Sequence, residues 1–175
     1  YQYDGSIWEQ LGGDIDGEEG GDQRGWSVSL SADGSVVAIG AIGNDGNGDL
    51  SGHVRVFQIA KRNSWVQQGL NIVDNDADDE SGHSVSLNGD GSMLAIGSYA
   101  HNSNRGKVDV YVYENSKWNS DLSLSSIDGY FYGFSVSLSK SGSVLAVSSE
   151  AWKGATGKVD ILEKQENLSL IHISE

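Results

Sequence analysis

The chain consists of short segments whose polar and apolar positions recur in the same order three times. The first segment alternates small polar residues with apolar ones, which is the period-two pattern of a β-strand with one buried face. Its copies are Gly25–Leu30, Gly82–Leu87 and Gly133–Leu138. The alternation therefore predicts one strand of this kind in every repeat.

Two further segments follow the first in each copy. The second is apolar at nearly every position, which suits a strand buried between neighbouring sheets. Its copies are Ser35–Gly40, Ser92–Gly97 and Ser143–Ser148. The third alternates apolar with polar residues, and its copies are Gly52–Phe57, Gly106–Tyr111 and Gly157–Leu162. Links such as Ala32-Asp33-Gly34 predict tight turns, because glycine adopts the positive φ that a hairpin needs.

A tryptophan separates the repeats and marks a fourth, outer strand in each. Trp8, Trp65 and Trp118 hold this position, and Trp65–Gln68 is half apolar and half polar. No stretch has the helical period, so no helix is predicted. Four short antiparallel strands in a long repeat predict an all-β chain of β-propeller blades. A β-solenoid is the alternative, although its rungs are usually shorter and need no hairpin turns.

The composition excludes several classes of protein. The 175 residues carry 11 Lys and Arg against 25 Asp and Glu, a formal charge of −14, and no basic patch is present, which argues against a nucleic-acid partner. There is no cysteine, which excludes disulfides and thiolate metal sites. No apolar run is long enough for a membrane span in this segment.

The repeated segments resemble the FG-GAP repeats, best known from the propeller of integrin alpha chains. The matching residues are Trp8-Glu-Gln10, Gly25-Trp-Ser-Val-Ser, Ala38-Ile-Gly40-Ala41 and Gly52-His-Val-Arg-Val-Phe57. The phenylalanine of the Phe-Gly pair is replaced by Arg24, Ser81 and Tyr132, and the proline of Gly-Ala-Pro is missing throughout. A WD40 propeller is the nearest rival, but this period is longer and the Trp-Asp pair is absent. The resemblance implies a propeller arc from an extracellular or cell-surface protein.

The repeats predict the organisation of the chain as one arc over residues 1–167. We expect residues 1–12 to end a preceding blade, 13–70 to form blade one, 71–121 blade two, and 122–167 an incomplete blade three. Residues 168–175 fit no repeat and resemble a translated sequencing adapter, so they are expected to be a non-native tail; an ordinary apolar final strand is the alternative. Because a closed propeller takes typically 4–8 blades, the chain is expected to be a fragment whose partners include further blades of its parent.

The acidic residues concentrate in the loops expected on one face of the blades. A calcium ion takes 6–8 oxygen ligands, and loops with alternating carboxylates supply them. The candidate Ca²⁺ ligands are Asp74, Asp76, Asp78, Asp79 and Glu80, with Asp14, Asp16 and Glu18 as a second set. A solvated acidic loop that keeps the protein soluble is the competing interpretation for both sets.

Other loop residues on that face are candidates for contact with a partner, since binding sites usually lie on loops of a rigid scaffold. They are Asn44, Asp45, Asp49, Tyr99 and Trp152. His83 stands at the position of the repeat that Trp26 and Phe134 hold in the other copies, so it is expected to be a packing residue.

Nothing in the sequence predicts catalysis. No nucleophile elbow, zinc-protease motif or phosphate loop is present, and the paired carboxylates lack the apolar pocket that raises the pKa of an acid. We therefore expect a non-catalytic extracellular adhesion module whose acidic face binds a protein or a glycan, with Ca²⁺ as the candidate ion. An accessory propeller of an extracellular hydrolase and a structural spacer in a surface array are the alternatives.

Overall fold

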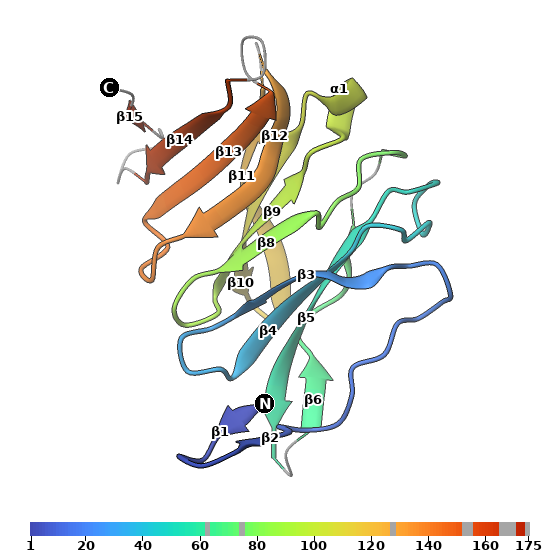
Figure 1. Cartoon of the computed structure of the whole chain (residues 1–175), viewed down its shortest axis with the longest axis vertical. Helices are drawn as coiled ribbons and strands as arrows, with labels where there is room; N and C mark the ends of the chain where they lie inside the picture. Colours follow the sequence, from blue (N-terminus) through green and yellow to red (C-terminus); the bar gives the residue numbers. More distant parts are fainter. Residues whose placement is uncertain (62–63, 74–75, 127–128, 152–155, 165–170, 174–175) are drawn as a thin grey trace.

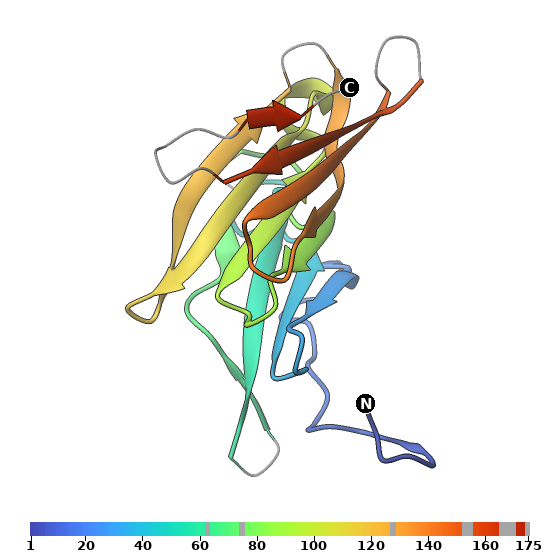
Figure 2. The same ribbon diagram turned by 90° about the vertical axis from the view of Figure 1, so that its left-hand side faces the viewer.

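A computed structural model shows stacked antiparallel sheets (Figures 1 and 2). The structure describes residues 1–61, 64–73, 76–126, 129–151, 156–164 and 171–173. For residues 171–173 it describes the backbone alone. The three large sheets follow one another along the chain, and we call them blades one, two and three. Each pairs its strands in chain order, which is the arrangement that the repeats predict.

The strands have the following bounds. Blade one contains β3 (Arg24–Leu30), β4 (Val36–Ala41), β5 (His53–Ala60) and β6 (Ser64–Gln67), and β7 (Ile72–Val73) also pairs with β5. Blade two contains β8 (Ser84–Leu87), β9 (Met93–Ser98), β10 (Lys107–Glu114) and β11 (Lys117–Ser125). Blade three contains β12 (Tyr130–Leu138), β13 (Val144–Ala151), β14 (Lys158–Glu163) and β15 (Ile171–Ile173). A separate hairpin pairs β1 (Gln2–Tyr3) with β2 (Trp8–Glu9).

The strands of blades one and two extend past the blade boundaries that the sequence predicts. Ile72–Val73 pairs within blade one, and Leu122–Ser125 pairs within blade two, past the predicted ends at 70 and 121. The reason is that Leu122 and Leu124 still pack against the core. At the other end of the arc, β15 pairs antiparallel with β14, with Ile173 opposite Ile161.

A single short turn, α1 (His101–Asn104), lies where the sequence predicts no helix. Its φ angles are left-handed at Asn102, Ser103 and Asn104, at 52°, 59° and 68°. Asparagine tolerates this region better than most residues because its short polar side chain bonds locally. The segment is therefore a left-handed turn between β9 and β10 rather than a regular helix.

The hairpin turn between β3 and β4 is fixed by one aspartate. The Asp33 carboxylate accepts hydrogen bonds from the Ser35 amide (2.9 Å), the Ser31 hydroxyl (2.7 Å) and the Ser35 hydroxyl (2.8 Å). Because these bonds favour the charged form, they lower the pKa of Asp33 to about 2. Gly34 follows at φ 72°. The Asp-Gly signal in the sequence thus forms the turn that it predicts.

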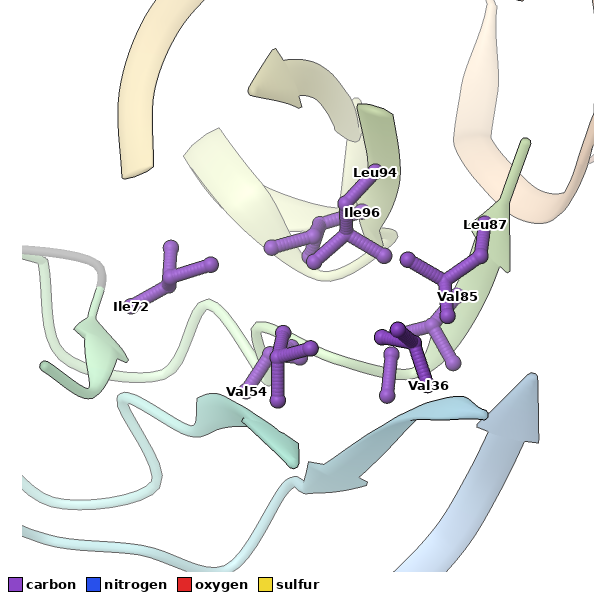
Figure 3. Close-up of a cluster of buried hydrophobic side chains, with 9 residues drawn as sticks. Val36, Val54, Ile72, Val85, Leu87, Leu94 and Ile96 are labelled. Carbon is purple, nitrogen blue, oxygen red and sulfur yellow. The ribbon is translucent and has the colours of Figure 1, made fainter. Parts of the chain in front are cut away.

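The core lies between the blades. Figure 3 shows side chains from β4, β5 and β7 pointing toward those from β8 and β9. The buried residues of this interface are Val36, Ala38, Val54, Val56, Ile72, Val85, Leu87, Leu94 and Ile96. Blades two and three share a second cluster of Ala95, Val108, Val110, Tyr132, Val136, Leu145, Val147 and Leu162. Since a fully buried aliphatic side chain contributes about 1.5–3 kcal/mol, the packing of each blade against the next stabilises the fold.

The two junctions between blades repeat the same contacts. The Ser27 hydroxyl donates to the Gly82 carbonyl across the first junction (2.6 Å), and the Ser84 hydroxyl donates to the Gly133 carbonyl across the second (2.8 Å). A Cβ built on Gly40 or Gly97 would lie closer than 3.0 Å to these same carbonyls. Glycine in the second strand is therefore required by the close approach of the next blade. Blade three has Ser148 at this position, where its hydroxyl accepts from the Ser135 amide (3.0 Å).

Residues at equivalent positions of the repeat are buried where two blades meet and exposed where the first and last blades have no neighbour. Val85 and Leu87 of blade two are 9% and 5% exposed, whereas the equivalent Val28 and Leu30 of blade one are 65% and 60% exposed. Val159 in blade three is likewise 62% exposed. The alternation thus marks which residues face a neighbouring blade, and burial follows only where that blade is present.

Candidate functional site

Four loops of blades one and two lie along one edge of the stacked sheets. They precede the first strand or join the second strand to the third, and such loops leave an antiparallel sheet at the same edge. Figure 1 shows α1, the loop before β8 and the β4–β5 loop on the same side of the molecule. We call this side the acidic edge because these loops carry Asp14, Asp16, Glu18, Glu19, Asp22, Asp45, Asp49, Asp76, Asp78, Asp79 and Glu80.

Blade one forms an acidic cleft of about 660 Å³ at this edge. It is bounded by residues 18–22, 43–47 and 49–50, together with Asn71 and Val73. Asp22 is buried and accepts hydrogen bonds from the Glu19 amide (3.2 Å) and the Asn44 side chain (3.1 Å). The bond from Asn44 joins the two loops, and both bonds compensate the burial of a polar group.

The predicted partner residues Asn44, Asp45 and Asp49 all line this cleft. Asp45 accepts a hydrogen bond from the Leu50 amide (2.8 Å), so it also shapes its own loop. The exposed carboxylates of Glu19 and Asp49 accept no hydrogen bond from the described residues. They are the cleft groups most available to a partner.

The second set of predicted calcium ligands is not gathered around one point. Asp14 accepts from the Gln10 side chain (2.7 Å), and Glu18 pairs with Arg55 (3.1 Å). Arg24 donates to the backbone carbonyl of Asp16. Among the described residues, these three carboxylates do not form a group with metal-ligand spacing.

The first set contributes two residues to a cluster with a histidine. The ligand atoms of Asp76, Asp79 and His101 all lie within 4.8 Å of one another. His101 Nδ1 is 2.7 Å from the Asp79 carboxylate, which is buried. The three side chains face a cavity of about 530 Å³ lined by residues 76–79 and 100–104. This Asp76–Asp79–His101 cluster is the arrangement in the described residues that has the spacing of a metal site.

The other members of that set have different positions. Asp78 and Glu80 have left-handed φ angles of 63° and 50° and do not join the cluster. Glu80 lies beside Tyr99, whose pKa is raised by burial and then by this carboxylate. Asp74 lies outside the described residues, as does Trp152.

Sequence reasoning missed His101. The residue stands 22 positions after Asp79 and on another loop, so no linear spacing connects them. The order of the strands could have indicated the contact, because the β7–β8 and β9–β10 loops lie at the same edge of blade two.

An aromatic group lies beside the cluster. His83 packs between Trp26 and Phe134, with ring centroids 5.7 and 4.9 Å away, which confirms the packing expected from its position in the repeat. Tyr99 packs against His83 in a tilted arrangement, with ring centroids 4.2 Å apart. The predicted partner residue Tyr99 is therefore engaged with other rings and is only partly exposed.

A buried histidine makes the stability of the fold sensitive to acid. His53 is 2% exposed, and its pKa is lowered from 6.5 mainly by burial, with Glu18 and Asp22 opposing this and Arg24 and Arg55 adding to it. A lowered folded pKa means that the unfolded chain binds more protons below about pH 6.5, so stability falls as the pH decreases from that value.

We expect the free energy of unfolding, measured by urea titration, to be lower at pH 5 than at pH 7, and this difference to shrink in the variant His53→Gln. His83 shifts in the same direction for the same main reason, so the variant should not abolish the pH dependence. Asp33 titrates only at much lower pH and does not affect this window. A pH slope that is identical in His53→Gln would contradict the assignment.

Comparison with known families identifies one repeat. Residues 15–57 match the FG-GAP repeat model; they include β3, β4 and the first part of β5. The resemblance read from the sequence is therefore confirmed for this repeat. No curated protein sequence matches the chain. In the described part of the chain, no helix has the length and apolar character that crossing a bilayer requires.

Solved structures support the propeller-like fold. The chain is similar to the hydrazine synthase of Kuenenia stuttgartiensis, with a TM-score of 0.58 and 16% identity, over 83% of this chain and 41% of that one. It is also similar to a putative 6-phosphogluconolactonase from Bacteroides uniformis, with a TM-score of 0.57 and 15% identity, over 83% of this chain and 39% of that one. The chain thus spans about two fifths of these structures. At such identity the likeness concerns the fold alone.

Proposed function

We propose that the chain is a non-catalytic binding module of an extracellular protein and that its acidic edge binds a protein or a glycan. The observation that carries the proposal is the acidic cleft of blade one, which two loops of a rigid sheet form together. The FG-GAP match supports the extracellular location, because such repeats are typical of extracellular proteins.

The charge of the cleft favours a protein whose contacting segment is rich in lysine and arginine. Glu18, Glu19, Asp22, Asp45 and Asp49 all line it, and Arg55 pairs with only one of them, Glu18. A field of one sign in a concave surface raises the local concentration of oppositely charged partners and speeds their association. Hydroxyl-rich glycans without positive charge gain nothing from this field.

A labelled oligolysine peptide tests the proposal directly. We expect it to bind the chain at about 0.15 M salt, and we expect the variant Glu19→Gln with Asp49→Asn to bind roughly three- to tenfold more weakly, since exposed ion pairs contribute about 0.2–1 kcal/mol each. Fluorescence anisotropy measures both affinities. Neither side chain accepts a hydrogen bond from the described residues, so the fold should be unaffected.

The matched control removes two carboxylates from the opposite edge. Glu114 and Glu163 are exposed at the ends of β10 and β14, and Glu114→Gln with Glu163→Gln changes the net charge by the same amount. An affinity within about twofold of the original chain is expected, because separations beyond a Debye length of about 8 Å are screened at 0.15 M salt. Equal losses in both double variants would show that net charge, and not the cleft, governs binding.

A further inference from the structure

We propose that Asp76, Asp79 and His101 form a site for a transition-metal ion of the zinc class, in preference to calcium. The site belongs to blade two and does not depend on partner binding in the acidic cleft of blade one. The sequence alone points to calcium in this loop, and the imidazole of His101 changes the class of ion.

The donor atoms are brought together by two loops. Asp76 and Asp79 come from the loop before β8, and His101 begins the left-handed turn between β9 and β10. Their ligand atoms lie within 4.8 Å of one another, so one ion between them can reach all three with small side-chain adjustments. Zinc bonds to histidine nitrogen and carboxylate oxygen at about 2.0–2.2 Å.

Both loops are anchored by backbone hydrogen bonds. The amides of Asp78 and Glu80 donate to the carbonyls of Asp49 (2.8 Å) and Leu50 (3.0 Å) in blade one. In the second loop, the Gly106 amide donates to the His101 carbonyl (2.9 Å). The ligands are therefore held in place by the fold, which lowers the entropy that metal binding would otherwise cost.

The donor set decides the class of ion. Calcium takes 6–8 oxygen ligands in flexible sites, whereas a nitrogen donor with two carboxylates suits zinc and its neighbours. Three protein ligands also leave a fourth position of a tetrahedral ion open. The cavity of about 530 Å³ beside the cluster has room for water or for a donor group of a partner at that position.

Burial of Asp79 supports a cation at this point. Its side chain is 3% exposed and contacts His101. A dication bound between the two groups would be shielded from water, where its attraction for the carboxylate is stronger than at the surface. An aspartate–histidine pair without any metal is the competing arrangement, and the experiment separates the two.

The test is titration of the untagged chain with Co²⁺, followed by visible absorption, and with Zn²⁺, followed by calorimetry. We expect one ion to bind per chain, and Co²⁺ to give the d–d absorption bands of a site with low coordination number. Added Zn²⁺ should remove these bands, whereas Ca²⁺ at about 5 mM should leave them unchanged. Asp76→Asn should weaken Zn²⁺ binding at least tenfold, since even outer-shell changes cost 10- to 100-fold. His101→Ala should weaken it by at least as much.

The control is Asp78→Asn. Asp78 is an exposed carboxylate of the same loop, two positions from Asp76 and outside the cluster, and its replacement should change the affinity by less than about twofold. Absence of Zn²⁺ and Co²⁺ binding would overturn the proposal in favour of the metal-free pair. Ca²⁺ binding that His101→Ala leaves unchanged, or equal losses in Asp76→Asn and Asp78→Asn, would overturn it in favour of a diffuse acidic loop.

Discussion

Replacing Gly97 with alanine is expected to lower the free energy of unfolding by about 3 kcal/mol, the upper range for overpacking a well-packed interface. A Cβ at this position meets the carbonyl oxygen of Gly133 in the next blade. A backbone carbonyl cannot move aside as a flexible side chain can, so the two blades must separate locally. The same carbonyl accepts the hydrogen bond from Ser84 (2.8 Å), and this bond is lost with the separation.

Thermal and urea unfolding measure this effect, with an expected decrease in melting temperature of roughly 6–12 °C for a chain of this size. The control is Gly13→Ala, because a Cβ at Gly13 would have no other atom within 4 Å and the φ of this residue is not left-handed. That change is expected to stay within about 0.5 kcal/mol. Similar losses at Gly97 and Gly13 would show that glycine matters here for chain flexibility and not for the approach of blade three.

Replacing Leu87 with alanine is expected to cost about 2–4 kcal/mol, whereas the same change at Leu30 is expected to cost less than about 1 kcal/mol. Both leucines end the first strand of their blade and share one column of the repeat. Leu87 is 5% exposed and packs in the cluster between blades one and two, while Leu30 is 60% exposed. Removing a buried side chain loses its transfer free energy and leaves a cavity.

The comparison of Leu87→Ala with Leu30→Ala isolates the stacking of blades from every local property of the strand. Strand propensity, neighbours in sequence and turn type are nearly the same at the two positions. Urea unfolding at constant pH gives both free energies, and unchanged m-values confirm that the same surface is exposed on unfolding. Equal losses at the two leucines would mean that the position in the repeat, and not packing against a neighbouring blade, determines the free energy lost on removing the side chain.

Most strands of this fold could be predicted from the sequence because their causes are local. The alternation over Ser84–Leu87 and the Asp33-Gly34 turn both act within a few residues, and the structure forms a strand and a turn there. The extension of β11 to Ser125 could not be predicted from the repeat. It depends on contacts that Leu122 and Leu124 make with residues distant in sequence.

The candidate sites were predictable only in part. The run of aspartates marked Asp76 and Asp79, and the polar loop marked Asn44, Asp45 and Asp49, which the structure gathers in one cleft. His101 gave no signal of its own, and Asp78 looked equivalent to its neighbours. Which carboxylates share a point depends on backbone angles such as the φ of 63° at Asp78, and a linear pattern does not contain them.

The sequence by itself determined the repeat, the strands and the one-sided distribution of acidic loops, because hydrophobic alternation and turn chemistry act over short distances. The tertiary structure decided three further things. It determined that Leu87 is buried and Leu30 is not, that Gly97 must lack a side chain, and that His101 lies against Asp79. Each of these depends on the contact of two segments far apart in the chain, and the free energy of that contact comes from packing one blade or loop against the next.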